Sequence, residues 1–227
     1  MLERVCFGRL AVDVFVLRTH GIGSASSTII EKIETMRNSG GASLAIYYHD
    51  FREEQKKNLH GLLSSILFQL CDQSDPYHDI VSNFYSTYGI QRPSDEDLER
   101  CLKELLEVPG QAPVYIIIDA LDECPTTSPR PSGPSPREEV LKLLVRLIES
   151  RLEKLRICVT SRREADIKVK FEPLTFRSIS IHEERGQLED IENYIRSIIN
   201  TDPRCQRWKE EDKQQVIEIL TDRADGM

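Results

Sequence analysis

The chain has 227 residues, a length that fits one globular domain, or one domain with a small helical appendage. Hydrophobic residues make up 39% of it and charged residues 30%, which suits a globular protein with a core, and its net charge of −8 disfavours sequence-independent binding to nucleic acid. The six cysteines are scattered without metal-ligand spacing, no apolar run could span a bilayer, and the N-terminus lacks a signal-peptide pattern, so we expect a cytoplasmic protein that binds neither zinc nor membranes.

The first half of the chain alternates between strand and helix patterns. Runs rich in β-branched and aromatic residues predict strands over 11–17 and 42–51. Apolar residues at helical spacing predict helices over 25–36, 59–71, 79–88 and 94–106. Gly40-Gly41 ends the first of these helices, and Val108-Pro109-Gly110 follows the last.

The second half continues the alternation. Residues 114–118 form an uninterrupted apolar run, which is typical of a central strand in a parallel sheet, and further strands are predicted over 155–160 and 178–182. Residues 125–136 are rich in proline and serine and predict a loop. Helices are predicted over 137–152, 188–199 and 209–223. This order predicts an α/β three-layer fold, a parallel sheet flanked by helices, with a helical C-terminal tail.

Three acidic residues follow the central apolar run, in the segment VYIIIDALDEC. Ligands of parallel sheets bind beyond the carboxyl ends of the strands, which is where Asp119 is expected. An aspartate there can hold Mg²⁺, and Asp122 or Glu123 can polarise the water that attacks a γ-phosphate. The pattern therefore predicts a nucleotide site of the Walker B type, although a strand ending in a polar turn with solvated acids would have the same sequence.

A second polar strand end follows one helix later. The strand over 155–160 leads into Ser161-Arg162-Arg163, and the single intervening helix makes it a plausible neighbour of the acidic strand. The guanidinium of Arg162 could bind a γ-phosphate at this end, although a plain surface arginine is the alternative. If the two strands are neighbours, Asp119 and Arg162 should face one cleft at the start of the first helix.

These segments together resemble the NACHT-type P-loop NTPase domain of fungal STAND signalling proteins, and most closely the group with a nephrocystin-3-like N-terminal domain. The resemblance rests on YIIIDALDEC, LRICVTSR, ASLAIYYHDFRE and LLSSILFQLC, and extends over 21–227. It implies a switch that binds ATP or GTP with Mg²⁺. In the roles that it implies, Asp119 is the metal ligand, Glu123 positions the hydrolytic water with support from Asp122, and Arg162 is the sensor.

The phosphate-binding loop departs from the family pattern GxxxxGK[ST]. The corresponding stretch, 20–28, keeps glycines and hydroxyls but contains no lysine, and the next lysine, Lys32, lies within the predicted helix. The loop is also several residues short. A partial anion-binding nest remains possible, and its candidate residues are Gly21, Gly23, Ser24, Ser26 and Ser27. A plain turn followed by a helix start is the alternative.

The sequence therefore predicts a divergent N-terminal segment with the first strand over 1–20, a NACHT-like nucleotide-binding domain over 21–200, and the start of a helical region over 201–227. We expect a nucleotide-binding module of a signalling NTPase with impaired hydrolysis, because a P-loop lysine acts most strongly on the transition state. Self-association or association with related NACHT proteins is a further expectation. Two alternatives stay open. One is an interaction fragment that binds no nucleotide. The other is an active NTPase that takes its cation from Arg162, Arg163 or a partner chain.

Overall fold

The structure is a computed structural model that describes residues 13–18, 24–50, 52–53, 56–129, 131–162, 164–171, 173–174, 177–180 and 185–224. The chain divides into two compact units, one made of residues 1–16 and 23–178 and the other of residues 17–22 and 179–227. The first unit contains the α/β core and the second contains a pair of helices, α7 and α8, that pack on each other.

Five strands form one sheet in the order β2-β3-β4-β1-β5. They are β1 (Asp13–Arg18), β2 (Ser43–Tyr48), β3 (Val114–Asp119), β4 (Leu155–Ser161) and β5 (Arg177–Ser180). Strands β2, β3 and β4 are parallel, with Tyr48 opposite Asp119 and Ile118 opposite Val159. The neighbour relation predicted for the acidic strand and the Thr-Ser-Arg strand is therefore confirmed, and their carboxyl ends lie side by side.

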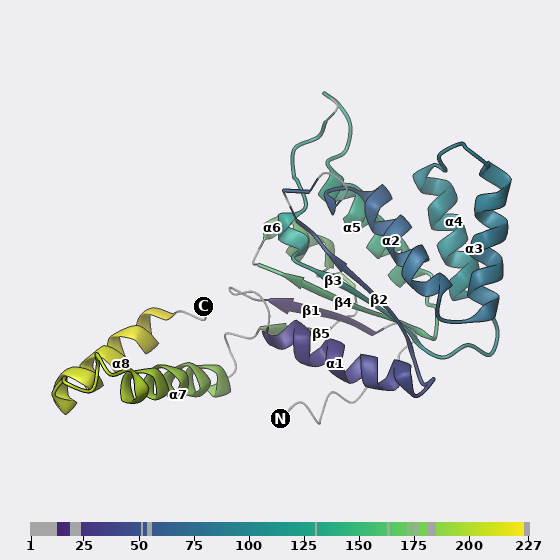
Figure 1. Cartoon of the computed structure of the whole chain (residues 1–227). Coiled ribbons are helices and arrows are strands. Elements are labelled where there is room, and N and C mark those ends of the chain that lie inside the picture. The colour runs from purple at the N-terminus through teal and green to yellow at the C-terminus, as the bar shows by residue number, and fades with distance from the viewer. Residues whose placement is uncertain are drawn as a thin grey trace. The chain divides into compact units, whose positions relative to one another are not determined.

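Helices cover both faces of this sheet, with α1 on one face and α2 and α5 on the other (Figure 1). The predicted α/β class, a parallel sheet flanked by helices, is confirmed. The helices of the described ranges are α1 (Ser24–Asn38), α2 (Leu59–Cys71), α3 (Asp75–Tyr88), α4 (Asp95–Leu106), α5 (Pro136–Glu149), α6 (Ala165–Phe171), α7 (Arg185–Thr201) and α8 (Glu210–Ala224). None of these helices combines the length and the apolar character that a membrane crossing requires.

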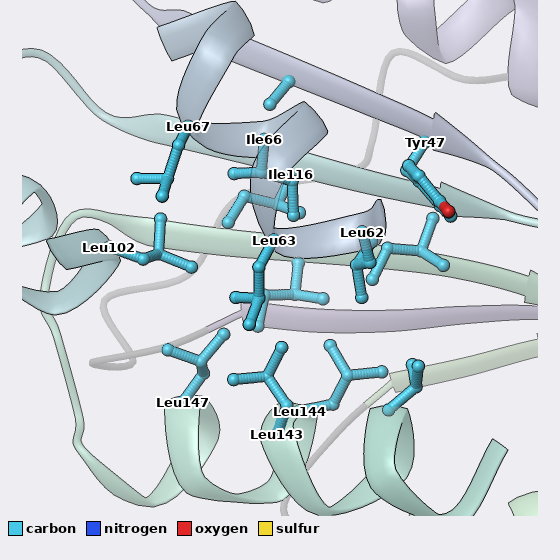
Figure 2. Close-up of a cluster of buried hydrophobic side chains, with 14 of the residues drawn as sticks. Tyr47, Leu62, Leu63, Ile66, Leu67, Leu102, Ile116, Leu143, Leu144 and Leu147 are labelled. Atoms are coloured by element: carbon cyan, nitrogen blue, oxygen red, sulfur yellow. The ribbon is translucent and has the colours of Figure 1, made fainter. Parts of the chain in front are cut away.

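The main core lies between the sheet and the helices α2, α4 and α5. Every residue of β3 is buried, so both faces of this strand are covered, as its unbroken apolar run predicts. Alternate residues of β3, including Ile116, face the core cluster. Figure 2 shows Leu63 of α2 facing the leucines of α5, with Ile116 beside Ile66 and Leu102 of α4 beside Leu67. This packing fixes the position of the β3 carboxyl end in the first unit.

The predicted elements differ from the observed ones mainly at their ends. Helix α3 begins four residues earlier than predicted, because Ser74 caps it and Pro76 occupies its first turn. Strand β2 ends at Tyr48 rather than at residue 51. Helix α6 was not predicted, since its seven residues bury only Ile167 and Phe171 and so leave little helical pattern.

Helix α4 begins with a capping box formed by Ser94 and Asp97. We expect a Ser94→Ala substitution to lower the free energy of unfolding by about 1 kcal/mol. The Ser94 hydroxyl accepts the Asp97 N–H at 3.2 Å, and the Asp97 carboxylate accepts the Ser94 N–H at 3.3 Å. The hydrogen bond from the Ser94 hydroxyl also lowers the pKa of Asp97 to about 2. Urea unfolding at neutral pH measures the loss. Ser94→Asp should keep most of the stability, and equal losses in both variants would argue against a capping role.

Candidate functional site

Asp119 and Thr160 join the carboxyl ends of β3 and β4. Asp119 is only 9% exposed. Its Oδ1 accepts a hydrogen bond of 2.6 Å from the Thr160 hydroxyl, which in turn accepts the N–H of Ala120 at 2.9 Å. Among the described residues, Asp119 Oδ2 takes part in no hydrogen bond or ion pair. The threonine thus fixes the carboxylate and leaves one oxygen for another ligand.

The chain turns sharply after Asp119. Ala120 adopts the left-handed conformation, with φ 55° and ψ 47°, which is a strained conformation for a residue with a Cβ. A single 3-10 turn, Leu121–Glu123, follows, and the Glu123 N–H bonds the Ala120 carbonyl at 2.9 Å. This turn places Asp122 and Glu123 beside the strand end, and both are half-buried.

Asp122 and Arg162 connect the loops that follow the two strands. The Asp122 carboxylate accepts the Arg162 backbone N–H at 3.0 Å and lies 3.5 Å from its guanidinium Nε. The side chain of Asp122 is 10% exposed and that of Arg162 is 58% exposed. The two residues predicted to act separately, one on water and one on phosphate, are therefore paired with each other in this structure.

The candidate phosphate-loop residues are only partly described. Gly21 and Gly23 lie outside the described residues. The backbone of Ser24, Ser26 and Ser27 forms the first turn of α1, which contains no acidic residue. Helix N-termini present unpaired N–H groups that favour anions. The predicted meeting of this helix start with Asp119 and Arg162 stays a prediction, since it depends on residues 19–23.

Two residues of this region have no role in the sequence-based prediction. Thr160 holds Asp119, and Arg137 of α5 is 6% exposed and donates its Nε to the Cys124 carbonyl at 2.9 Å. The sequence did contain a signal for Thr160, because its hydroxyl lies at the end of a strand whose predicted neighbour ends in Asp119. Nothing in the sequence distinguishes Arg137 from the other charged residues of its amphipathic helix.

Cysteines next to the site are protonated at neutral pH. Burial, with a smaller contribution from the Asp119 charge, raises the pKa of the Cys158 thiol to about 12. Burial likewise raises the pKa of Cys124 to about 12. Thiolates are the reactive form of cysteine, so neither side chain has the properties of a nucleophile. Their role fits small buried side chains, as the scattered spacing predicts.

A cavity of about 760 Å³ lies at the opposite end of the sheet. Its lining includes Ser43 at the amino end of β2, Gln111 before β3, and Arg37 of α1. Because ligands of parallel sheets bind at the carboxyl ends of the strands, this cavity is distinct from the site around Asp119.

Comparisons with known proteins give one family match. Residues 19–162 match the family model described as Nephrocystin 3, N-terminal, which is more than half of the chain. This range contains Asp119, Asp122, Glu123 and Arg162. No curated protein matches the chain.

The similar solved structures share little sequence with this chain. The Aeropyrum pernix ORC2 protein, in its ADPNP–ADP complexes, has 14% identity and a TM-score of 0.46, with 93% of this chain and 50% of that chain covered. Cdc6p from Pyrobaculum aerophilum has 9% identity and a TM-score of 0.48, with 81% and 42% covered. A chain of Drosophila ORC bound to AT-rich DNA and Cdc6 has 11% identity and a TM-score of 0.45, with 95% and 73% covered. The chain thus spans half or less of the first two of these structures.

Proposed function

The chain belongs to the nephrocystin 3 N-terminal family, and from this premise we propose that it is a NACHT-like module that binds ATP or GTP with Mg²⁺ in a signal-transduction NTPase. The observation that supports this most is Asp119, which ends the buried interior strand β3 and is oriented by Thr160. A buried carboxylate with one oxygen lacking a described partner is poorly explained as a solvated turn residue.

The donor set around Asp119 fits Mg²⁺ held jointly with phosphates. In the described ranges, no group of three or more His, Cys, Asp or Glu side chains could form a complete protein cage for a metal ion. Mg²⁺ is usually bound through one or two carboxylates together with substrate phosphates and water, so a single aspartate suffices. When bound, Mg²⁺ would neutralise phosphate charge. In this proposal Asp119 is its protein ligand.

The other residues at the strand ends have proposed roles around this ligand. Glu123 would position the hydrolytic water, Asp122 would support it, and Arg162 would sense the γ-phosphate. Gly21, Gly23, Ser24, Ser26 and Ser27 would line the phosphate with backbone N–H and hydroxyl groups. Without a lysine in this loop, charge stabilisation in the transition state is reduced, so we infer that hydrolysis is impaired.

Titration with a fluorescent ATP analogue, with and without Mg²⁺, tests the proposal. Wild-type protein should show saturable binding that Mg²⁺ strengthens, with little phosphate release. Asp119→Asn should weaken Mg²⁺-dependent binding at least about tenfold, or ~1.4 kcal/mol. Asp72→Asn is the matched control, because Asp72 lines the cavity at the opposite end of the sheet. Absence of saturable binding, or equal binding by both variants, would refute the nucleotide site.

The second candidate function is a protein-interaction fragment that binds no nucleotide. The observation in its favour is the apolar surface of the second unit, where Tyr194 is 69% exposed, Ile198 45% and Trp208 42%. Exposed aromatic side chains are enriched at interaction surfaces. Sedimentation at rising protein concentration distinguishes the candidates when combined with the nucleotide titration. Association without nucleotide binding would favour this second function.

A further inference from the structure

Arg137 is a buried charge on the first turn of α5, with a side chain only 8% exposed. A buried guanidinium is costly unless its donors are paired. Its Nε donates to the Cys124 carbonyl at 2.9 Å, and its Nη2 donates to the Asp122 carbonyl. Its Nη1 lies 3.4 Å from both Asp166 carboxylate oxygens and 3.7 Å from the Glu164 carboxylate.

The partners of Arg137 belong to two segments that follow neighbouring strands, here called the strand-end loops. Asp122 and Cys124 follow β3, while Glu164 and Asp166 follow β4, with Asp166 in the first turn of α6. The same two loops are joined a second time, because the Asp122 carboxylate binds the backbone N–H and the guanidinium of Arg162. The contacts therefore form a closed ring, from Arg137 to Asp122, to Arg162, along the chain to Glu164 and Asp166, and back to Arg137.

We propose that Arg137 is a positioning residue that holds the two strand-end loops together and thereby keeps Arg162 paired with Asp122. Its planar fork suits this task, since several N–H groups at fixed angles can bind two carbonyls and a carboxylate at once. A lysine has the same charge without the fork. The functional meaning rests on the proposed function: a γ-phosphate would compete with Asp122 for Arg162, and Arg137 sets how firmly Asp122 holds it.

A purely structural role for Arg137 predicts a different result. In that case substitution of Arg137 would lower the free energy of global unfolding, as would the loss of any comparable ion pair on α5. Arg146 provides this comparison, because it lies in the last turn of the same helix and binds the Glu99 carboxylate through two nitrogens. Arg146 is more exposed than Arg137, so the comparison needs a local readout at Arg162 rather than a measure of total stability.

Hydrogen exchange of the Arg162 amide is that readout, because this N–H bonds the Asp122 carboxylate. The experiment uses the full chain without nucleotide and compares Arg137→Met and Arg137→Lys with Arg146→Met. Both Arg137 variants should speed exchange at Arg162 at least about tenfold, through local opening, and Arg146→Met should change it less than about twofold. Equal effects of Arg137→Met and Arg146→Met, or full rescue by lysine, would overturn the proposal.

If Arg137→Met does not fold, a second variant that leaves Arg137 in place can test the same proposal. Glu164 and Asp166 are exposed, so Glu164→Gln with Asp166→Asn opens the ring on one side while the buried guanidinium stays in place. Exchange at Arg162 should rise about threefold or more, and an unchanged rate would overturn the proposal. A separate titration with Mg²⁺ and the ATP analogue tests the proposed function itself. If wild-type protein does not bind nucleotide, the proposed function fails, whereas the exchange results still decide the role of Arg137.

Discussion

Replacing both Gln69 and Gln73 with leucine is expected to lower the free energy of unfolding by about 2 to 4 kcal/mol and to make copies of the chain associate. Strand β2 lies at the edge of the sheet, and its outer backbone groups would otherwise be open. The Gln73 side chain accepts the Leu44 N–H at 2.8 Å and donates to the Leu44 carbonyl at 2.6 Å. In the same way, the Gln69 side chain accepts the Ile46 N–H at 2.9 Å and donates to the Ile46 carbonyl at 2.8 Å.

The two glutamines can bond the edge of β2 as a neighbouring strand would, because the spacing of residues along the helix nearly matches the spacing along the strand. Residues four apart on a helix are separated by about 6 Å along its axis, and residues two apart on a strand by about 6.6 Å. Glutamines at positions 69 and 73 of α2 can therefore each reach the open backbone N–H and carbonyl of one residue of β2. An amide side chain is suited to this role since it has both a donor and an acceptor. The edge is thus closed to strand addition without a further strand.

Urea unfolding and size-exclusion chromatography over a range of protein concentrations measure the two effects. Leucine keeps the size and helix propensity of the side chain while removing its polar atoms. Gln91→Leu is the matched control, because Gln91 is exposed in the turn after α3. A double variant that stays as stable and as dispersed as the Gln91→Leu protein would show that the side chains do not protect the edge.

The acidic end of β3 was predictable from sequence because its signal is local. Three isoleucines followed by Asp119 describe a strand buried on both faces that ends at a ligand-binding edge, and in the structure this strand is an interior one, buried along its whole length between β2 and β4. The adjacency of the two strands that lead to Asp119 and Arg162 followed from topology, since one crossover helix places successive parallel strands side by side. Both inferences needed only the residue patterns of the elements and the order of these elements along the chain.

The side-chain pairings at the site were not predictable in the same way. The contact of Asp122 with Arg162 depends on the left-handed turn at Ala120, a residue type that rarely adopts this conformation. Arg137 reaches Asp166 across 29 positions of sequence, and no periodic pattern encodes such a contact. Side-chain pairings of this kind depend on the conformation of the loops, which the conformational preferences of individual residues do not specify.

His49 should make the protein less stable in acid, by about 3 kcal/mol between pH 6.5 and pH 4. Its ring is 3% exposed at the carboxyl end of β2, where its backbone N–H bonds the Asp119 carbonyl at 3.0 Å. Nδ1 lies 3.1 Å from the Lys56 carbonyl, so this nitrogen carries the hydrogen, and the buried Nε2 has no hydrogen-bond partner among the described residues. Protonation would place a second N–H there without an acceptor.

Burial lowers the pKa of His49 from 6.5 to about 4, and the nearby Arg137 guanidinium lowers it further, while the Lys56 carbonyl and the Asp122 carboxylate oppose the shift. Because the folded state has the lower pKa, the unfolded chain binds the proton first. The contribution to stability is therefore complete above about pH 6.5 and is lost as the pH falls toward 4.

Urea unfolding at several pH values, compared between wild type and His49→Phe, isolates this group from the carboxylates that also titrate in acid. The aromatic ring retains the edge-on contact with Tyr47 but has no titrating nitrogen. The difference in unfolding free energy between the two proteins should change by about 3 kcal/mol across the window, whereas the exposed-histidine control His78→Gln should follow wild type. A constant difference would mean that His49 is not buried in its neutral form. Since the His49 backbone bonds Asp119 and its ring interacts with the charges of Asp122 and Arg137, acid should loosen the strand-end loops first, and exchange at the Arg162 amide should quicken before the protein unfolds.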